Sequence, residues 1–247
     1  MSRYFLELSY MGTAYSGFQV QANANSIQAE IEKAFFVYFR QPVNMTGSSR
    51  TDTGVHARQN YFHFDFEERI SQDAVYRLNA ILPGDISIRS IREMPAGAHC
   101  RFDAESREYR YYTYGKKDPF LRDRAYYYPY PVDLGQMQEA SRRLVKNQDF
   151  SSFSKRNTQV KNFLCTVWES EWEREGDCLL YRIRANRFLR GMVRGLTGTL
   201  LQVGRGILTI EDFEEIVAGK DRNKVNFNVP AKGLFLVNVR YREGLMC

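Results

Sequence analysis

Short stretches in which apolar and polar side chains alternate are the feature that most constrains the fold of this chain. The first stretch runs from residue 4 to residue 10. Tyr4, Leu6, Leu8 and Tyr10 form one side of the alternation, and Phe5, Glu7 and Ser9 form the other. This period of two predicts a strand with one face against a core. Helical spacing follows, in the series Ile27, Ile31, Ala34, Phe35 and Tyr38. Asn25 and Gln28 resemble a capping box, so an amphipathic helix that packs on a sheet is predicted.

The same two patterns recur along the rest of the chain. Further strands are predicted over residues 43–46, 60–66, 86–92, 107–114 and 234–241, and on both sides of Gly176-Asp177. Helices are predicted over residues 71–82, 133–144 and 188–203, and from Thr209 onward. Strands and helices mixed in both halves predict an α+β fold with two domains, residues 1–104 and residues 105–247.

The composition of the chain limits the kinds of binding partner, metal site and cellular location that we expect. The chain has 35 Lys and Arg against 29 Asp and Glu, a net charge of +6, which suits a polyanionic partner and an ordinary basic surface about equally well. Its four cysteines are widely scattered, with no histidine pair at zinc-ligand spacing, so we expect neither a metal site nor a disulfide framework. No apolar run is long enough to cross a bilayer, and the first residues follow a strand pattern, so we expect a cytoplasmic protein.

Arginine and tyrosine interleave between residues 107 and 114, in the order Arg107-Glu108-Tyr109-Arg110-Tyr111-Tyr112-Thr113-Tyr114. Such a segment can offer stacking faces beside phosphate contacts. On the pattern alone, a half-buried strand rich in tyrosine explains it better.

A polar loop bounded by glycines holds the most reactive combination of side chains. It reads Gly47-Ser48-Ser49-Arg50-Thr51-Asp52-Thr53-Gly54-Val55-His56-Ala57, with a carboxylate, a guanidinium and an imidazole within seven residues. Loops held between strands often display catalytic groups. The alternative is a tight turn in which Asp52 bonds its own backbone ahead of Gly54, and for an arbitrary Asp-x-Gly loop that alternative is favoured.

The loop resembles the Gly-x-x-Arg-Thr-Asp-x-Gly-Val-His signature of the TruA family of tRNA pseudouridine synthases. Other segments agree in order along nearly the whole chain: Ser26-Ile27-Gln28, Leu82-Pro83-Gly84-Asp85-Ile86, Arg101-Phe102-Asp103-Ala104, Tyr109-Arg110-Tyr111, Asp149-Phe150-Ser151-Ser152-Phe153, the segment from Asn186 to Arg194, and Gly233-Leu234-Phe235-Leu236-Val237. The chain departs from the family pattern at Ser48, Ser49, Cys100 and Gly191, none of which lies in the Arg-Thr-Asp core.

The resemblance implies a fold, an activity and a set of site residues. The implied fold has two similar α+β halves related by a pseudo-two-fold, with antiparallel sheets joined across a central basic cleft, and the implied assembly is a homodimer. The implied enzyme isomerises uridine to pseudouridine at positions 38, 39 and 40 in the anticodon stem-loop of tRNA. At the matching positions, Asp52 is the essential carboxylate, Tyr109 packs on the target base and Arg194 pairs with Asp52.

These residue types fit the chemistry of the implied reaction. Pseudouridine formation breaks the bond from uracil N1 to ribose C1′, turns the base over and rejoins it through C5, so no cofactor and no metal is required. A carboxylate can attack C1′, as in retaining glycosidases, or take a proton from C2′ to give a glycal. The sequence leaves both routes open. A phenol with a pKa near 10 is a poor base at neutral pH, so stacking or relay through water is the expected role of Tyr109.

The remaining candidates contact RNA. A uridine inside an A-form stem must be flipped out, and Arg50 is a candidate to fill the vacated space or to hold the flanking phosphate, with a structural ion pair as an equal alternative. Candidates for phosphate contacts are Arg101, Arg107, Arg110, Lys155 and Arg156. We assign His56 no chemical role, because a hydrogen-bonded loop histidine explains it. The competing functions are a non-catalytic RNA-binding protein and a paralogue with different target uridines; a metal-dependent nuclease would need clustered carboxylates.

Overall fold

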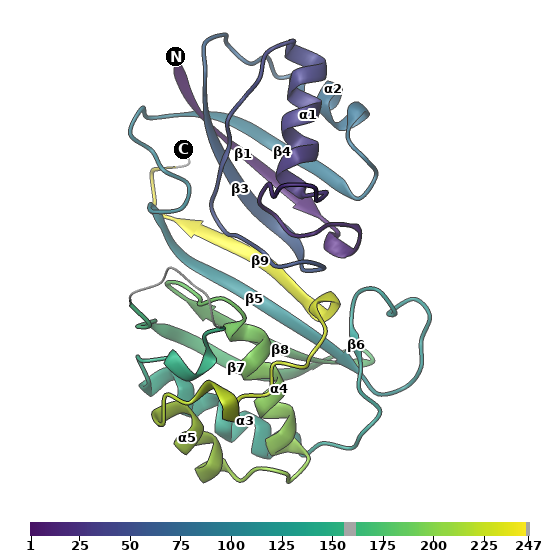
Figure 1. Ribbon diagram of the computed structural model, residues 1–247, viewed down its shortest axis with the longest axis vertical. Coiled ribbons are helices and arrows are strands. Elements are labelled where there is room, and N and C mark those ends of the chain that lie inside the picture. The colour runs from purple at the N-terminus through teal and green to yellow at the C-terminus, as the bar shows by residue number, and fades with distance from the viewer. Residues whose placement is uncertain (156–161, 246–247) are drawn as a thin grey trace. The chain divides into compact units, whose positions relative to one another are not determined.

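Two compact units make up the computed structural model, which describes residues 1–155 and 162–245 (Figure 1). The first unit comprises Met1–Ser106 together with the chain from Phe235 onward, and the second comprises Arg107–Leu234. The division into residues 1–104 and 105–247 stays a prediction. The compact units differ from it mainly because the last strand belongs with the N-terminal unit.

The first unit is built on an antiparallel group of strands with one parallel addition. Its strands are β1 (Ser2–Tyr10), β2 (Thr46–Gly47), β3 (His56–Phe66), β4 (Ile86–Met94) and β9 (Leu234–Tyr241). Strand β1 lies between β4 and β3 and is antiparallel to both, and β2 pairs antiparallel with β3. Strand β9 joins β3 in parallel, with His56 opposite Phe235 and Ala57 opposite Leu236.

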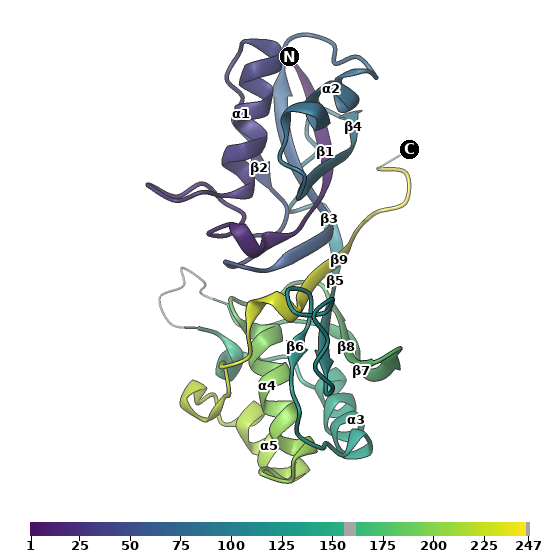
Figure 2. The ribbon, with the colours of Figure 1, turned by 90° about the vertical axis from the view of Figure 1, so that its right-hand side faces the viewer.

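Aromatic side chains fill both faces of these strands. Helix α1 (Ile27–Phe39) covers one face of the strands (Figure 2). Its Phe35 ring centroid lies 5.2 Å from that of Phe64. On the other face, Phe5 is 1% exposed and its ring lies 5.5 Å from that of Tyr241. The predicted polar side of β1 is therefore wrong at Phe5, because the C-terminal strand returns to cover that face.

The first helix begins one residue later than its predicted capping box. Ser26 is the N-cap, and its hydroxyl accepts a hydrogen bond from the Ala29 amide. The predicted Asn25 cap is therefore wrong. Ser26, whose backbone is extended, instead accepts a hydrogen bond from an amide in the first turn of the helix. The second helix, α2 (Ala74–Ile81), is shorter than predicted and ends just before Leu82-Pro83.

The second unit combines three antiparallel strands with three helices. Its strands are β5 (Ala104–Tyr114, which begins in the first unit), β6 (Tyr126–Tyr127), β7 (Val167–Glu175) and β8 (Cys178–Ala185). Its helices are α3 (Leu134–Arg143), α4 (Met192–Gly204) and α5 (Ile210–Ala218). Strand β8 lies between β5 and β7, and β6 pairs in parallel with the end of β5. The hairpin at Gly176-Asp177 and the start of a helix at Thr209, with its Thr209/Asp212 capping box, are confirmed.

Two further predictions need correction. The strand predicted over residues 43–46 reduces to β2, and the helix predicted from residue 188 begins at Met192, after Gly191 with a φ of 77°. The short 3-10 turns that join the elements are Gly12–Ala14, Leu144–Lys146, Ser151–Phe153, Arg222–Lys224 and Ala231–Gly233. The predicted fold class, α+β, is confirmed, since mostly antiparallel strands combine with five α-helices within the described residues.

Two kinds of feature, a membrane-spanning helix and a cluster of metal ligands, are absent from the residues that the structure describes. Among the helices of residues 1–155 and 162–245, none has the length and hydropathy to cross a membrane. The same residues contain no group of three or more His, Cys, Asp or Glu side chains placed to hold a metal ion.

A buried histidine on β3 couples the stability of the fold to pH. The His63 side chain is 8% exposed, and burial, reinforced by nearby His99 and Arg3, lowers its pKa from 6.5 to about 4. As the pH falls below 6.5, the unfolded chain binds a proton that the folded chain excludes, so the free energy of unfolding falls; below about pH 4 both states are protonated and this loss ends.

We expect His63→Gln to remove this part of the pH dependence. Between pH 7 and pH 5 the variant should lose roughly 1–2 kcal/mol less free energy of unfolding than the wild type. Urea unfolding at both pH values measures the difference. Equal losses in the two proteins would show that other groups cause the pH dependence.

Candidate active site

Buried hydrogen bonds tie the loop that carries Asp52 to the strands around it. This segment, residues 48–55, is called the Asp52 loop below. The Ser48 amide donates to the Tyr61 carbonyl at 2.8 Å, and Asn60 Nδ2 donates to the Ser49 carbonyl at 2.8 Å. Asn60 is completely buried on β3, so the first half of the loop is anchored to the interior of the sheet.

Thr51, the residue before the aspartate, is held on two sides. Its hydroxyl lies 2.8 Å from the Tyr10 hydroxyl, which also accepts a bond from Asn60 Nδ2 at 3.3 Å. Its carbonyl accepts the Phe18 amide at 3.1 Å. Because Thr51 is buried, these bonds replace water and restrict the backbone from which the Asp52 side chain projects.

Asp52 itself is half-buried at the start of a tight turn. The Asp52 carbonyl accepts the Val55 amide at 3.1 Å, and Gly54 adopts a φ of 77°, in the region that favours glycine. The turn is thus closed by backbone groups. A tight turn and a displayed carboxylate are compatible here, because the bond that closes the turn joins two backbone groups and does not require the Asp52 carboxylate.

His56 has a structural role in the same segment. Its side chain is fully buried, its Nδ1 accepts the Gly12 amide at 2.9 Å, and its ring lies 4.5 Å from that of Phe235. A Cβ on Gly12 would meet the Val55 carbonyl, so only glycine allows this approach of the two loops. His56 therefore joins the end of the Asp52 loop to β9.

The cations near the Asp52 loop are exposed. Arg50 is exposed within the loop, and Arg58 is exposed on β3 with its guanidinium carbon 5.8 Å from the centre of the Phe235 ring. Sequence reasoning missed Arg58, although its position six residues after Asp52 places it on the strand that follows the loop. Arg101 lies outside this loop, in the segment between β4 and β5, and is also exposed, with its guanidinium carbon 5.9 Å from the centre of the Phe102 ring.

In the second unit, Tyr109 lies on β5 at the edge of a small aromatic group. Its side chain is 8% exposed and its ring meets that of Phe188 edge to face at 5.0 Å. Tyr111, two residues along the same face, is fully buried; its hydroxyl donates to the Pro230 carbonyl at 2.7 Å, and burial raises its pKa. Tyr111 therefore lies in the core of the second unit. Phe188 is a site neighbour that sequence reasoning placed in a helix.

Arg107 and Arg110 project from opposite faces of β5. Arg107 donates to the Asn186 carbonyl at 2.9 Å. Arg110 pairs with Glu108 at 2.9 Å and lies 3.9 Å from Glu175, on the face away from Tyr109. Arg182 and Arg184 extend these ion pairs across β8 to Glu171 and Glu169 of β7. Arg110 therefore takes part in ion pairs on the sheet, and its contact with phosphate stays a prediction.

Arg194 lies in the first turn of α4. Its Nε donates to the Val229 carbonyl at 2.9 Å, which fixes the plane of a half-buried guanidinium. Within its own unit, no carboxylate of the described residues pairs with it. Its pairing with Asp52, which belongs to the first unit, stays a prediction.

Lys155 lies beside the beginning of the same helix. Its amide donates to the Arg190 carbonyl at 2.9 Å, and its ammonium nitrogen lies 6.0 Å from the centre of the Phe227 ring. A Cβ on Gly191 would come within 2.8 Å of the Lys155 stem, so lysine occupies the space above this glycine. Arg156, the other candidate of this segment, lies outside the described residues.

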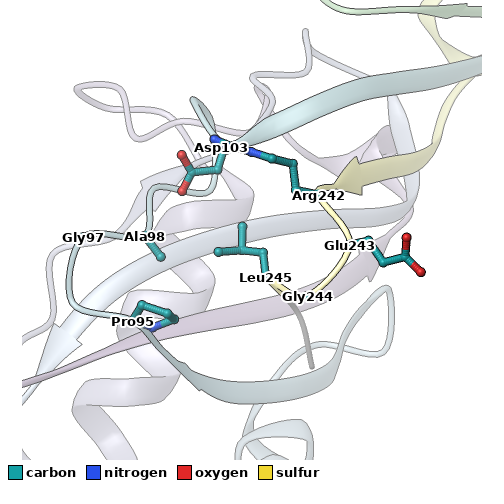
Figure 3. A pocket seen from close by; sticks show the side chains of 8 residues that line it. All are labelled: Pro95, Gly97, Ala98, Asp103, Arg242, Glu243, Gly244 and Leu245. Atoms are coloured by element: carbon teal, nitrogen blue, oxygen red, sulfur yellow. The ribbon is translucent and has the colours of Figure 1, made fainter.

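A shallow hollow of about 420 Å³ lies in the first unit, between the loop after β4 and the segment after β9 (Figure 3). Its lining consists of Pro95, Gly97, Ala98, Asp103, Arg242, Glu243, Gly244 and Leu245. It contains none of the predicted site residues, and its charges have both signs. We therefore do not include it in the candidate site.

Comparison with known proteins decides the family. A family model described as tRNA pseudouridine synthase matches residues 140–242. The tRNA pseudouridine synthase A of Parabacteroides distasonis is 46% identical over 99% of this chain and 98% of its own length. The proteins of the same name from Bacteroides thetaiotaomicron and Listeria monocytogenes are 44% and 39% identical, over 99% and 98% of this chain and 93% and 100% of their own lengths.

The chain belongs to the tRNA pseudouridine synthase family. It is accordingly an enzyme of the isomerase class, and the family resemblance predicted from the Arg-Thr-Asp motif is confirmed. Membership does not by itself assign roles to side chains. The roles of Asp52, Tyr109, Arg194 and Arg50 in this tRNA pseudouridine synthase stay predictions.

The bonds of Asn60 should matter for both stability and catalysis. Asn60→Ala leaves the buried Ser49 carbonyl and Tyr10 hydroxyl without this donor and the Tyr61 amide without its acceptor, so we expect a loss of roughly 1–3 kcal/mol in the free energy of unfolding. Because the same bonds hold the Asp52 loop, the rate of pseudouridine formation should also fall at temperatures where the variant is folded.

Urea unfolding and single-turnover assays measure the two effects. Asn44→Ala is the matched control, because Asn44 is exposed just before β2. A variant Asn60→Ala with normal stability would contradict the anchoring role of Asn60.

Proposed function

We propose that this chain isomerises uridine to pseudouridine in the anticodon stem-loop of tRNA, at positions 38, 39 and 40. The observation that carries the proposal is the full-length identity with proteins named tRNA pseudouridine synthase A, which reaches 46% over 99% of the chain. The Asp52 loop supports it independently. A half-buried carboxylate on a loop anchored by buried hydrogen bonds is what a reaction at a ribose carbon requires.

In the proposed reaction, the glycosidic bond from N1 to C1′ breaks and a new bond from C5 to C1′ replaces it. Asp52 either attacks C1′ as N1 leaves and is later displaced by C5, or takes the C2′ proton and returns it after the base has turned. In both routes, the proton on C5 leaves after the new bond forms and N1, which departed without a proton, gains one, so the composition of the nucleotide is unchanged. Asp52 must be ionised at the start of either route.

Tyr109 and Arg194 have complementary roles in this proposal. The Tyr109 ring, held edge to face against Phe188, is a rigid surface on which uracil can stack. The Arg194 guanidinium, with its Nε bound to the Val229 carbonyl, has its terminal N–H groups directed by that bond and orients the Asp52 carboxylate. Arg50 holds the flanking phosphate or fills the space left by the flipped nucleotide. Family resemblance also supports a homodimer and a cytoplasmic location.

Asp52→Asn should abolish product formation. The variant keeps the size of the side chain but removes the nucleophile or base, so we expect turnover of an unmodified tRNA transcript to fall by at least about a hundredfold while tRNA binding remains. Mapping pseudouridine in the transcript measures the product and its position. Asp73→Asn, a change at an exposed aspartate of the same unit, is the control.

Equal product from the wild type and from Asp52→Asn would remove this carboxylate from the mechanism. Tight tRNA binding without product from the wild type would favour the non-catalytic RNA-binding alternative. Product at other uridines would favour the paralogue.

Arg194→Lys should impair catalysis, because lysine does not replace arginine at this position. Lysine keeps the charge but has no Nε donor for the Val229 carbonyl and no planar pair of donors for a carboxylate. We expect kcat to fall roughly 10- to 100-fold, with KM for tRNA little changed, because the lost interaction orients a catalytic group. Arg142→Lys on α3 is the matched control, since Arg142 is exposed. A loss confined to KM would assign Arg194 to tRNA binding instead.

A further inference from the structure

The segment that follows β5 exposes aromatic rings on a basic surface of the second unit. In residues 115–130, Phe120 is 79% exposed, Tyr130 is 51% exposed and Tyr127 is 41% exposed. Lys116, Lys117, Arg122 and Arg124 outnumber Asp118 and Asp123 in this segment. This combination contrasts with β5 itself, where the interleaved tyrosines are buried.

The tyrosines form two groups of contacting rings, and one of these groups ends on an arginine. Ring centroids are 5.3 Å apart between Tyr114 and Tyr127, 5.4 Å between Tyr126 and Tyr128, and 5.2 Å between Tyr128 and Tyr130. The Arg205 guanidinium carbon lies 4.2 Å from the centre of the Tyr130 ring. We call Tyr127, Tyr128, Tyr130 and Arg205, together with the basic residues of 116–124, the distal patch.

The distal patch lies at the far ends of the two elements that carry the predicted substrate contacts. Tyr109 is near the start of β5 and Tyr114 ends it, so five residues of strand separate them by roughly 17 Å. Arg194 is in the first turn of α4 and Arg205 directly follows its last residue, a separation along the helix of roughly 16 Å. No single nucleotide can contact Tyr109 and the distal patch at once.

The chemistry of the distal patch suits RNA. Exposed tyrosines beside arginine stack on unpaired bases, and the surrounding cations neutralise phosphates. The strand face that carries Arg182 and Arg184 differs, because glutamates of β7 already pair with those arginines. At the centre of an interface between protein chains, lysine and aspartate are depleted, whereas this segment carries Lys116, Lys117, Asp118 and Asp123.

Resting on the proposed function, we propose that the distal patch binds the substrate RNA at nucleotides remote from the target uridine. The distal patch extends the contact between protein and RNA from the target nucleotide to another part of the same RNA molecule. It contributes binding and orientation and takes no part in the chemical step.

The double variant Tyr130→Ala/Arg205→Ala tests this role with full-length tRNA transcript. Stacking and phosphate contacts are both removed, so we expect KM and the dissociation constant to rise roughly tenfold or more, with kcat within about twofold of the wild type. The dependence of binding on salt should also become shallower, because fewer counterions are released. Tyr130→Phe, which keeps the ring, should retain most of the affinity.

Controls separate this role from folding and from the proposed function. Tyr76→Ala removes a 74% exposed tyrosine of α2 in the first unit and should leave both constants unchanged. If the double variant is destabilised in urea unfolding, Lys116→Gln/Lys117→Gln tests the same surface through exposed side chains and should still raise KM. If the wild-type protein forms no pseudouridine, the proposed function is overturned. The role of the distal patch is then tested separately, by comparing tRNA binding of the wild type and the variants.

Photocrosslinking identifies the occupant directly. With p-benzoylphenylalanine in place of Tyr130, we expect a crosslink to tRNA at nucleotides away from the modified uridine, and none from the same probe at Tyr76. A crosslink to a second protein chain, with a change from dimer to monomer in Tyr130→Ala/Arg205→Ala, would overturn the proposal and assign the surface to self-association. Unchanged KM and binding, or a loss confined to kcat, would overturn it as well.

Discussion

The buried hydrogen bonds among Tyr10, Thr51 and Asn60 are the interaction on which the candidate site depends. They join β1 and β3 to the backbone just before Asp52. A loop of this composition would otherwise be mobile, since its polar groups bond equally well to water. The sheet therefore supplies the rigidity, and the loop supplies the reactive group.

The return of the last strand to the first unit has a second structural consequence. Strand β9 pairs in parallel with β3 at His56, whose imidazole bonds Gly12 and stacks near Phe235. The imidazole of the signature motif thus connects the end of the Asp52 loop to the C-terminal strand. A motif histidine close in sequence to an aspartate suggests a role in proton transfer, and the complete burial of His56 as an acceptor from Gly12 explains why a structural role fits better.

Local patterns predicted most elements because their causes are local. Strand β9, the hairpin at Gly176-Asp177 and the capping box at Thr209 depend on neighbouring residues alone, and all three are present as expected. Phe5 was misplaced because period-two reasoning assumes one covered face, and the cover of its face comes from Tyr241, far along the chain. The ion pairs of Arg110 were missed for the same reason, since Glu175 lies on a strand whose neighbours the sequence does not specify.

By itself, the sequence determined the α+β class, the succession of helices and strands, and membership of the tRNA pseudouridine synthase family, because periodicity and a contiguous motif are properties of short segments. Only the tertiary structure decided which tyrosines are buried and which are exposed: Tyr111 on β5 lies in the core, whereas Tyr127 and Tyr130 face solvent beside Arg205. The physical reason is that burial is set by neighbours brought together by folding, and identical residue types in similar local patterns meet different neighbours.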